Sequence, residues 1–119
     1  MSNGYSVVDM EDVEPAMGAF RKMRLALGAT GFGINHISLP ANGSGPEHDE
    51  EETRHEEVYV TLDGSGVLEL GGEQVEMRPG RWVRVDADRT RRMTAGDEGL
   101  VFIAVGAPSQ EPYRGRATL

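Results

Sequence analysis

The chain has 119 residues and a mass of 12.9 kDa, the size of one domain. It contains no cysteine, which excludes disulfides, thiolate nucleophiles and cysteine-ligated metals. This absence, together with an N-terminus that lacks a signal-peptide pattern, favours a cytoplasmic protein. The net charge of −8 and the short longest apolar run predict neither nucleic acid nor a membrane as partner.

Taken in chain order, short segments with period-two alternation and glycine-rich turns predict an all-β antiparallel barrel or sandwich. A helical turn is expected only within residues 13–22, and residues 42–54 read as a polar loop that enters a strand. Turns are expected at residues 63–66, at Gly71-Gly72 and at Pro79-Gly80. The expected strands are residues 22–27, 32–39, 57–62, 67–70, 74–77, 82–85 and 100–105.

Polar side chains gather at the start of the strand over residues 57–62. Because side chains alternate between faces, His55, Glu57 and Tyr59 share one face, and His48 and Glu50 share a face just before it. Two imidazoles and two carboxylates in a barrel interior can form a metal site or a general acid–base pair. Buried carboxylates need a cation or a proton, so a metal or an arginine must face them.

Residues 46–50 and 56–66 resemble the first motif of the cupin superfamily, a His-x-His pair followed by Glu and then by Gly. Glu57 and Gly64 keep the spacing of the last two. Residues 70–86 and 96–106 resemble the hairpin, second motif and closing strand of that superfamily. The resemblance implies a cupin-type double-stranded β-helix (jelly-roll) barrel, a single mono-cupin domain over residues 1–119. Its barrel core would cover about 20–107, with an N-terminal arm over 1–19 and a C-terminal tail over 108–119.

The chain departs from the metal-binding pattern of this superfamily. Glu50 stands at the second histidine of the first motif, and Arg91 stands at the histidine of the second, where a guanidinium cannot ligate a metal. His55 lies in an unusually long interval and is a candidate replacement ligand. Two readings remain: a divalent metal (Zn, Fe, Mn or Ni) held by His48, Glu50, His55 and Glu57, or a metal-free pocket in which Arg91 pairs with a carboxylate. We favour the second, with no tightly bound cofactor.

The sequence therefore predicts a module that binds a small polar or anionic molecule of unknown identity. The alternative is a metal-dependent or acid–base enzyme, an isomerase, cyclase, lyase or dioxygenase, whose catalytic residues the sequence does not assign. Apolar residues opposite the polar face of strand 57–62 predict a homodimer, and Trp82 is expected in the core or pocket wall. The orientations of His36 and Arg84 stay open. The expected ligand-binding residues are His48, Glu50, His55, Glu57, Tyr59 and Arg91.

Overall fold

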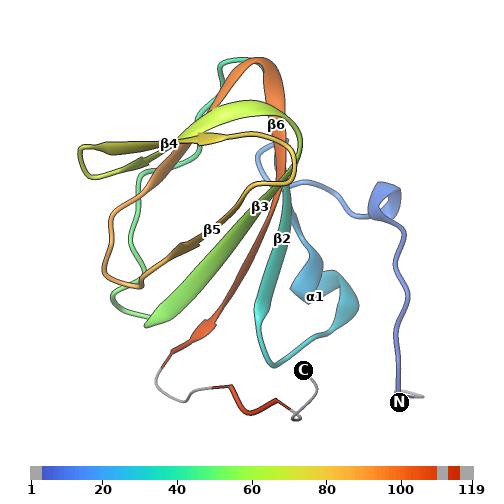
Figure 1. Cartoon of the computed structure of the whole chain (residues 1–119). Helices are drawn as coiled ribbons and strands as arrows, with labels where there is room; N and C mark the ends of the chain where they lie inside the picture. Colours follow the sequence, from blue (N-terminus) through green and yellow to red (C-terminus); the bar gives the residue numbers. More distant parts are fainter. Residues whose placement is uncertain (1–3, 110–112, 116–119) are drawn as a thin grey trace.

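The computed structural model describes residues 4–109 and 113–115, which form one antiparallel six-stranded sheet and two short helical segments (Figure 1). The predicted all-β class is confirmed. No helix in these residues is long and apolar enough to cross a membrane. The elements are η1 (Met10–Asp12), β1 (Phe20–Lys22), α1 (Met23–Leu27), β2 (Gly33–Leu39), β3 (His55–Leu70), β4 (Glu73–Met77), β5 (Trp82–Val85) and β6 (Arg92–Pro108).

The two long strands, β3 and β6, pair antiparallel along their whole length and organise the barrel. The strand order is β1-β2-β6-β3-β4, and β5 also pairs with β3. β5 pairs with the first part of β3 and β4 with the last part. Two register shifts, between Thr61 and Asp63 and between Gly64 and Gly66, fall between these parts. Such bulges bend a strand, which lets one pair of strands serve two faces of the barrel (Figure 1).

The predicted turn at residues 63–66 is therefore wrong, because these residues lie inside the continuous strand β3. Their Asp-Gly-Ser-Gly composition is typical of turns, but bulges use the same residues. Gly64 has φ +79°, a left-handed value that favours glycine, next to the register shift. The first half of β6, residues 92–99, was also not expected to be a strand. It is polar and glycine-containing, and pairing with β3 rather than its own propensity makes it extended.

The predicted strand over residues 22–27 is wrong as well, because Met23–Leu27 forms α1. Alternation over six residues does not distinguish a strand from one helical turn, and Met, Arg, Leu and Ala all favour helix. Gly28 ends the helix with φ +74° and donates its N–H to the carbonyls of Arg24 and Leu25. The helical turn expected within residues 13–22 is absent, and helical segments lie just before and just after that range, η1 and α1.

The two short turns are where the sequence placed them. Gly71 and Gly72 connect β3 to β4 with positive φ at both positions. Pro79 and Gly80 form the next turn, closed by a hydrogen bond from the Arg81 N–H to the Arg78 carbonyl at 3.0 Å. Together they place β4 and β5 on the same edge of β3. Of the expected tail over 108–119, residues 110–112 and 116–119 lie outside the described residues.

Side-chain alternation separates an inner face from an outer face. Inner residues such as Leu68, Met77 and Leu100 are almost fully buried. Trp82 was expected in the core or pocket wall, but it lies on the outer face and is 69% exposed. It is three positions before the buried Val85, so the two side chains point to opposite faces, and it pairs with the outward-facing Val60. We call the apolar outer surface of this sheet the outer face. Its residues are Ile34, Val58, Val60, Leu62, Trp82, Val101, Ile103 and Val105.

Candidate functional site

The barrel holds a cavity of about 150 Å³ above the inner face of β2, β6 and β3. The strand register sets Asn35, Ala104 and Tyr59 in one row across these strands. Because the Ala104 side chain is a single methyl group, it leaves space above the sheet between the larger side chains of Asn35 and Tyr59. The next row contains Glu57 beside Gly106, where an added Cβ would come within 3.2 Å of the Glu57 Cγ. The cavity is lined by Phe20, Asn35, Ile37, Leu39, Gly45, Pro46, His48, Glu50, Glu57, Tyr59, Leu68, Arg91, Met93, Phe102 and Ala104.

Residues 42–50, which we call the strap, carry two of the polar side chains to this cavity. The strap has almost no regular secondary structure, yet its backbone pairs with residues 87–96. His48 and Arg91 each donate a backbone N–H to the carbonyl of the other, at 2.9 and 2.8 Å. Glu50 donates its N–H to the Ala87 carbonyl at 2.7 Å. These backbone hydrogen bonds hold residues 48 and 50 at the cavity independently of any side-chain contact.

Arg91 and Glu57 form a buried ion pair. The Arg91 side chain is 1% exposed, and its Nη2 lies 3.4 Å from Glu57 Oε1, with the Glu57 side chain 15% exposed. The guanidinium also donates Nη1 to the Arg89 carbonyl at 2.7 Å and Nη2 to the Asp86 carbonyl at 3.3 Å. Only Nε lacks a partner among the described residues. The expected pairing of Arg91 with a carboxylate is present, and the hydrogen bonds of its guanidinium go to backbone carbonyls.

Tyr59 donates its hydroxyl to the same Glu57 oxygen, Oε1, at 2.7 Å. Burial, followed by the neighbouring negative charge of Glu57, raises the pKa of Tyr59 far above the usual value of a phenol. The hydroxyl is therefore protonated throughout the physiological range and acts as a donor. Its ring packs edge-on against Phe102, with centroids 5.9 Å apart. Tyr59 and Arg91 together engage one oxygen of Glu57 and leave Oε2 without a hydrogen bond among the described residues.

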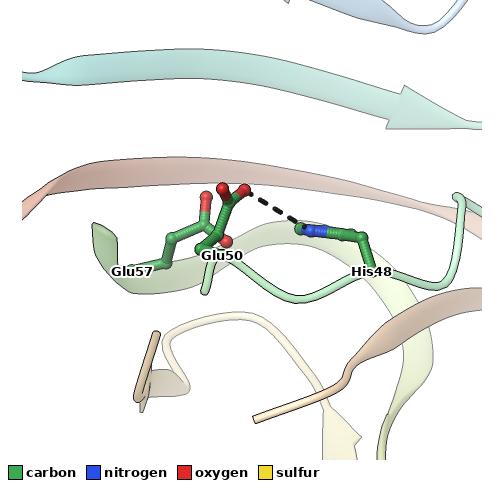
Figure 2. A group of neighbouring side chains, drawn as sticks. All are labelled: His48, Glu50 and Glu57. Carbon is green, nitrogen blue, oxygen red and sulfur yellow. Dashed lines mark ion pairs between the residues drawn. The ribbon is translucent and has the colours of Figure 1, made fainter. Parts of the chain in front are cut away.

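His48 and Glu50 complete the polar group, with His48 Nδ1 lying 3.4 Å from Glu50 Oε1 (Figure 2). One ligand atom from each of His48, Glu50 and Glu57 lies within 4.8 Å of the others. Figure 2 shows the two carboxylates side by side, with the imidazole directed toward Glu50. This His/Glu group has the donor types that a divalent metal uses. It fits a metal incompletely, because Glu57 is already paired with the Arg91 guanidinium.

His55 does not join this group. It shares the inward phase of Glu57, as expected, but it is the first residue of β3 and pairs with Pro108 at the strand end. It lies two positions before Glu57, a rise of about 7 Å along β3. The structure places five of the six expected ligand-binding residues in the cavity lining, and His55 is not among the lining residues.

Asn35 is the cavity residue that sequence reasoning missed. It lies on β2 across Ala104 from Tyr59, and its side-chain amide has no hydrogen-bond partner among the described residues. The alternation of Asn35 with Ile37 and Leu39 was the available signal, since those two apolar residues line the cavity. His36, in the opposite phase, faces outward, where burial and Arg21 lower its pKa. Arg84 is also on the outside and pairs with Glu56 and Asp86.

Comparisons with known proteins agree with this architecture. Residues 35–106 match the family described as the cupin domain. A cupin protein from Bacteroides fragilis is 24% identical, with 99% of this chain and 95% of that chain covered and a TM-score of 0.82. KdgF from Halomonas sp. is 14% identical (92% and 97% covered, TM-score 0.70). A predicted oxalate decarboxylase from Thermotoga maritima is 22% identical (86% and 98% covered, TM-score 0.71). No curated protein matches the chain.

Proposed function

Because the chain belongs to the cupin domain family, we propose that it is a mono-cupin that binds a small molecule in its barrel cavity without a tightly bound metal. The observation that carries the proposal is the buried ion pair between Arg91 and Glu57. The guanidinium supplies the positive charge that a metal would otherwise provide to this carboxylate. It would also repel a divalent ion placed at the same oxygens, since unit charges a few ångströms apart interact strongly away from bulk water.

The size of the cavity limits the ligand. A cavity of about 150 Å³ is comparable to one that admits benzene. One side offers apolar and aromatic surface from residues such as Ile37, Met93 and Phe102, and the other offers the polar group around Glu57. Such a mixture is typical of ligand sites, in which apolar walls provide affinity and a few polar groups fix orientation. The ligand is accordingly a compact molecule with an apolar body and at least one polar group.

A second candidate is an enzyme acting on a small metabolite, either metal-dependent or by acid–base chemistry. The observation that favours it is the group formed by His48, Glu50 and Glu57, whose ligand atoms lie within 4.8 Å. With a divalent ion bound, these residues would provide one nitrogen and two oxygen ligands, and the ion would supply Lewis acidity. Without a metal, His48 beside Glu50 at 3.4 Å forms an acid–base pair.

One experiment separates the two candidates. Tag-free protein is dialysed against metal-free buffer without a chelator, and its metal content is measured by elemental analysis. The same sample is screened by NMR for binding of compact organic molecules. We expect well below one transition-metal ion per chain and amide shifts confined to the cavity lining. A matched variant, Ala104→Leu, fills the floor of the cavity and leaves every polar group in place, so it should abolish those shifts.

About one metal ion per chain, lost in both His48→Ala and Glu57→Ala, would contradict the metal-free proposal and favour the metalloenzyme. Shifts that persist unchanged in Ala104→Leu would show that the molecules bind elsewhere. Either result is distinguishable from unfolding, because the amide spectrum of each variant reports directly on whether the barrel is intact.

The outer face supports a homodimer. Val58 and Val60 of β3 lie beside Val105 and Ile103 of β6, and all four are only partly buried in the single chain. Leu62 is 47% and Trp82 is 69% exposed on the same face. A contiguous apolar surface of this kind marks an interface more often than a solvated surface.

The lack of cysteine supports a cytoplasmic location for the protein.

Because of the apolar outer face, we expect light scattering at micromolar protein to give twice the monomer mass of 12.9 kDa. Trp82→Glu places a charge at the exposed part of the outer face and should shift the protein to the monomer. Met17→Glu is the control, since Met17 is also strongly exposed (86%) but lies outside that face. A parent protein that is monomeric at this concentration would reject the proposal.

A further inference from the structure

The polar end of the cavity contains more negative than positive formal charge. Glu50 and Glu57 are both at the cavity, with side chains 23% and 15% exposed, and Arg91 is the one lysine or arginine among its lining residues. Arg91 is paired with Glu57, so within residues 4–109 and 113–115 the one cationic partner of Glu50 is His48, whose charge depends on its protonation. Carboxylates in partly buried sites are stabilised by a cation or by several donors. A ligand that carries one positive charge would therefore balance the second carboxylate.

The two carboxylates are arranged to share such a charge. They come from different segments, Glu50 from the strap and Glu57 from β3, and each offers an oxygen within 4.8 Å of the other (Figure 2). Oε1 of Glu57 already accepts from Tyr59 and faces Arg91. Thr53 donates its hydroxyl to Glu50 Oε2 at 2.8 Å, which fixes that side chain in turn. Both carboxylates are thus oriented by the protein and retain accepting capacity toward the cavity.

We propose, resting on the proposed binding function, that the cavity selects a compact molecule carrying a protonated amine, whose ammonium group lies between Glu50 and Glu57. An ammonium group has three donors and no acceptor, which matches a site of two carboxylates. The apolar body of the ligand lies over Ala104 and packs against Phe102.

An anionic ligand fits the same residues poorly. Nε is the one Arg91 nitrogen without a partner among the described residues, and the two terminal nitrogens already face Glu57 and two backbone carbonyls. A carboxylate in the cavity would therefore meet the negative charges of Glu50 and Glu57 while competing for a guanidinium that is already paired. At the opposite side of the cavity, about 10 Å from Tyr59 along the sheet, Asn35 offers a neutral amide to a second polar group of the ligand.

The test uses three probes that share one ring and differ in charge: cyclopentylamine, cyclopentanol and cyclopentanecarboxylate. Each is titrated into chelator-treated full-length protein near pH 7, and binding is followed by amide shifts in NMR. We expect cyclopentylamine to bind about tenfold or more tightly than the other two, because only the amine compensates the second carboxylate. In Glu50→Gln, which keeps the shape and removes the charge, this preference should fall to less than about threefold.

Glu52→Gln is the matched control, because Glu52 is an exposed acid two residues after Glu50, beyond the strap, and does not line the cavity. It changes the net charge equally and should leave the preference unchanged. Equal or tighter binding of cyclopentanol or cyclopentanecarboxylate at the cavity would overturn the amine proposal and leave the binding function standing. If all three probes failed to shift cavity amides, or shifted them equally in Ala104→Leu, both the amine proposal and the binding function would be rejected.

Discussion

Replacing Arg91 by alanine is expected to lower the free energy of unfolding at pH 7 by about 3–5 kcal/mol. The side chain is 1% exposed, and its removal leaves Glu57 as a largely buried charge without its cation. It also frees the carbonyls of Arg89 and Asp86 that the guanidinium now satisfies. Chemical denaturation followed by circular dichroism measures the loss. The loss should shrink on acidification, because protonation neutralises the stranded carboxylate.

Two further variants make this prediction specific. Arg92→Ala removes the same charge from the next residue, which is exposed and has no ion pair among the described residues, so it should change stability by less than about 0.5 kcal/mol. Adding Glu57→Gln to Arg91→Ala should recover part of the lost stability, since the double variant no longer buries an unpaired charge. An Arg91→Ala protein as stable as the parent at neutral pH would show that the arginine lies in solvent.

Gly64→Ala is expected to destabilise the barrel by about 2–5 kcal/mol, the combined cost of a left-handed backbone and of overpacking. Gly64 has φ +79°, and an added Cβ would overlap the Gly99 carbonyl oxygen beside the register shift in the pairing of β3 with β6. The neighbouring atoms are backbone and cannot rotate away. Thermal and denaturant unfolding of the purified variant measure the effect.

Gly71→Ala separates the two contributions. Gly71 also has a positive φ, +58°, but an added Cβ there meets no atom within 4 Å. It should therefore cost only the backbone contribution, about 1–2 kcal/mol. Equal losses in the two variants would mean that the close approach of β3 and β6 at Gly64 contributes nothing to the energy.

The sequence predicted the fold well where short-range chemistry and chain order agree. Gly71-Gly72 and Pro79-Gly80 have dihedral preferences that permit few alternatives, so both turns were located correctly. Residues 63–66 use equally turn-like residues inside a strand. Whether such a segment turns or bulges depends on the pairing of β3 with β6, a long-range property that no local window contains. The strand predicted over residues 22–27 was wrong because six residues are too few to distinguish the period of a strand from that of a helix.

The site was predictable to the extent that it lies on β3. The phase of Glu57 and Tyr59 follows from strand alternation, and the position of Arg91 followed from the resemblance to the second cupin motif. The separation of His55 from the group was not predictable, because it depends on how the strap turns back into β3 at Arg54. Asn35 was overlooked because a neutral amide carries no signature until its neighbours across the sheet are known.

The backbone pairing of the strap has a consequence for the kinetics of binding. Moving His48 or Glu50 away from the cavity requires breaking hydrogen bonds to Arg91 and Ala87, each worth about 1 kcal/mol net. The polar end of the site is thus assembled in the free protein, and little ordering entropy remains to be lost when a molecule arrives. Association then behaves as a single encounter step, with an observed rate that rises linearly with ligand concentration and does not saturate at a loop-closing limit.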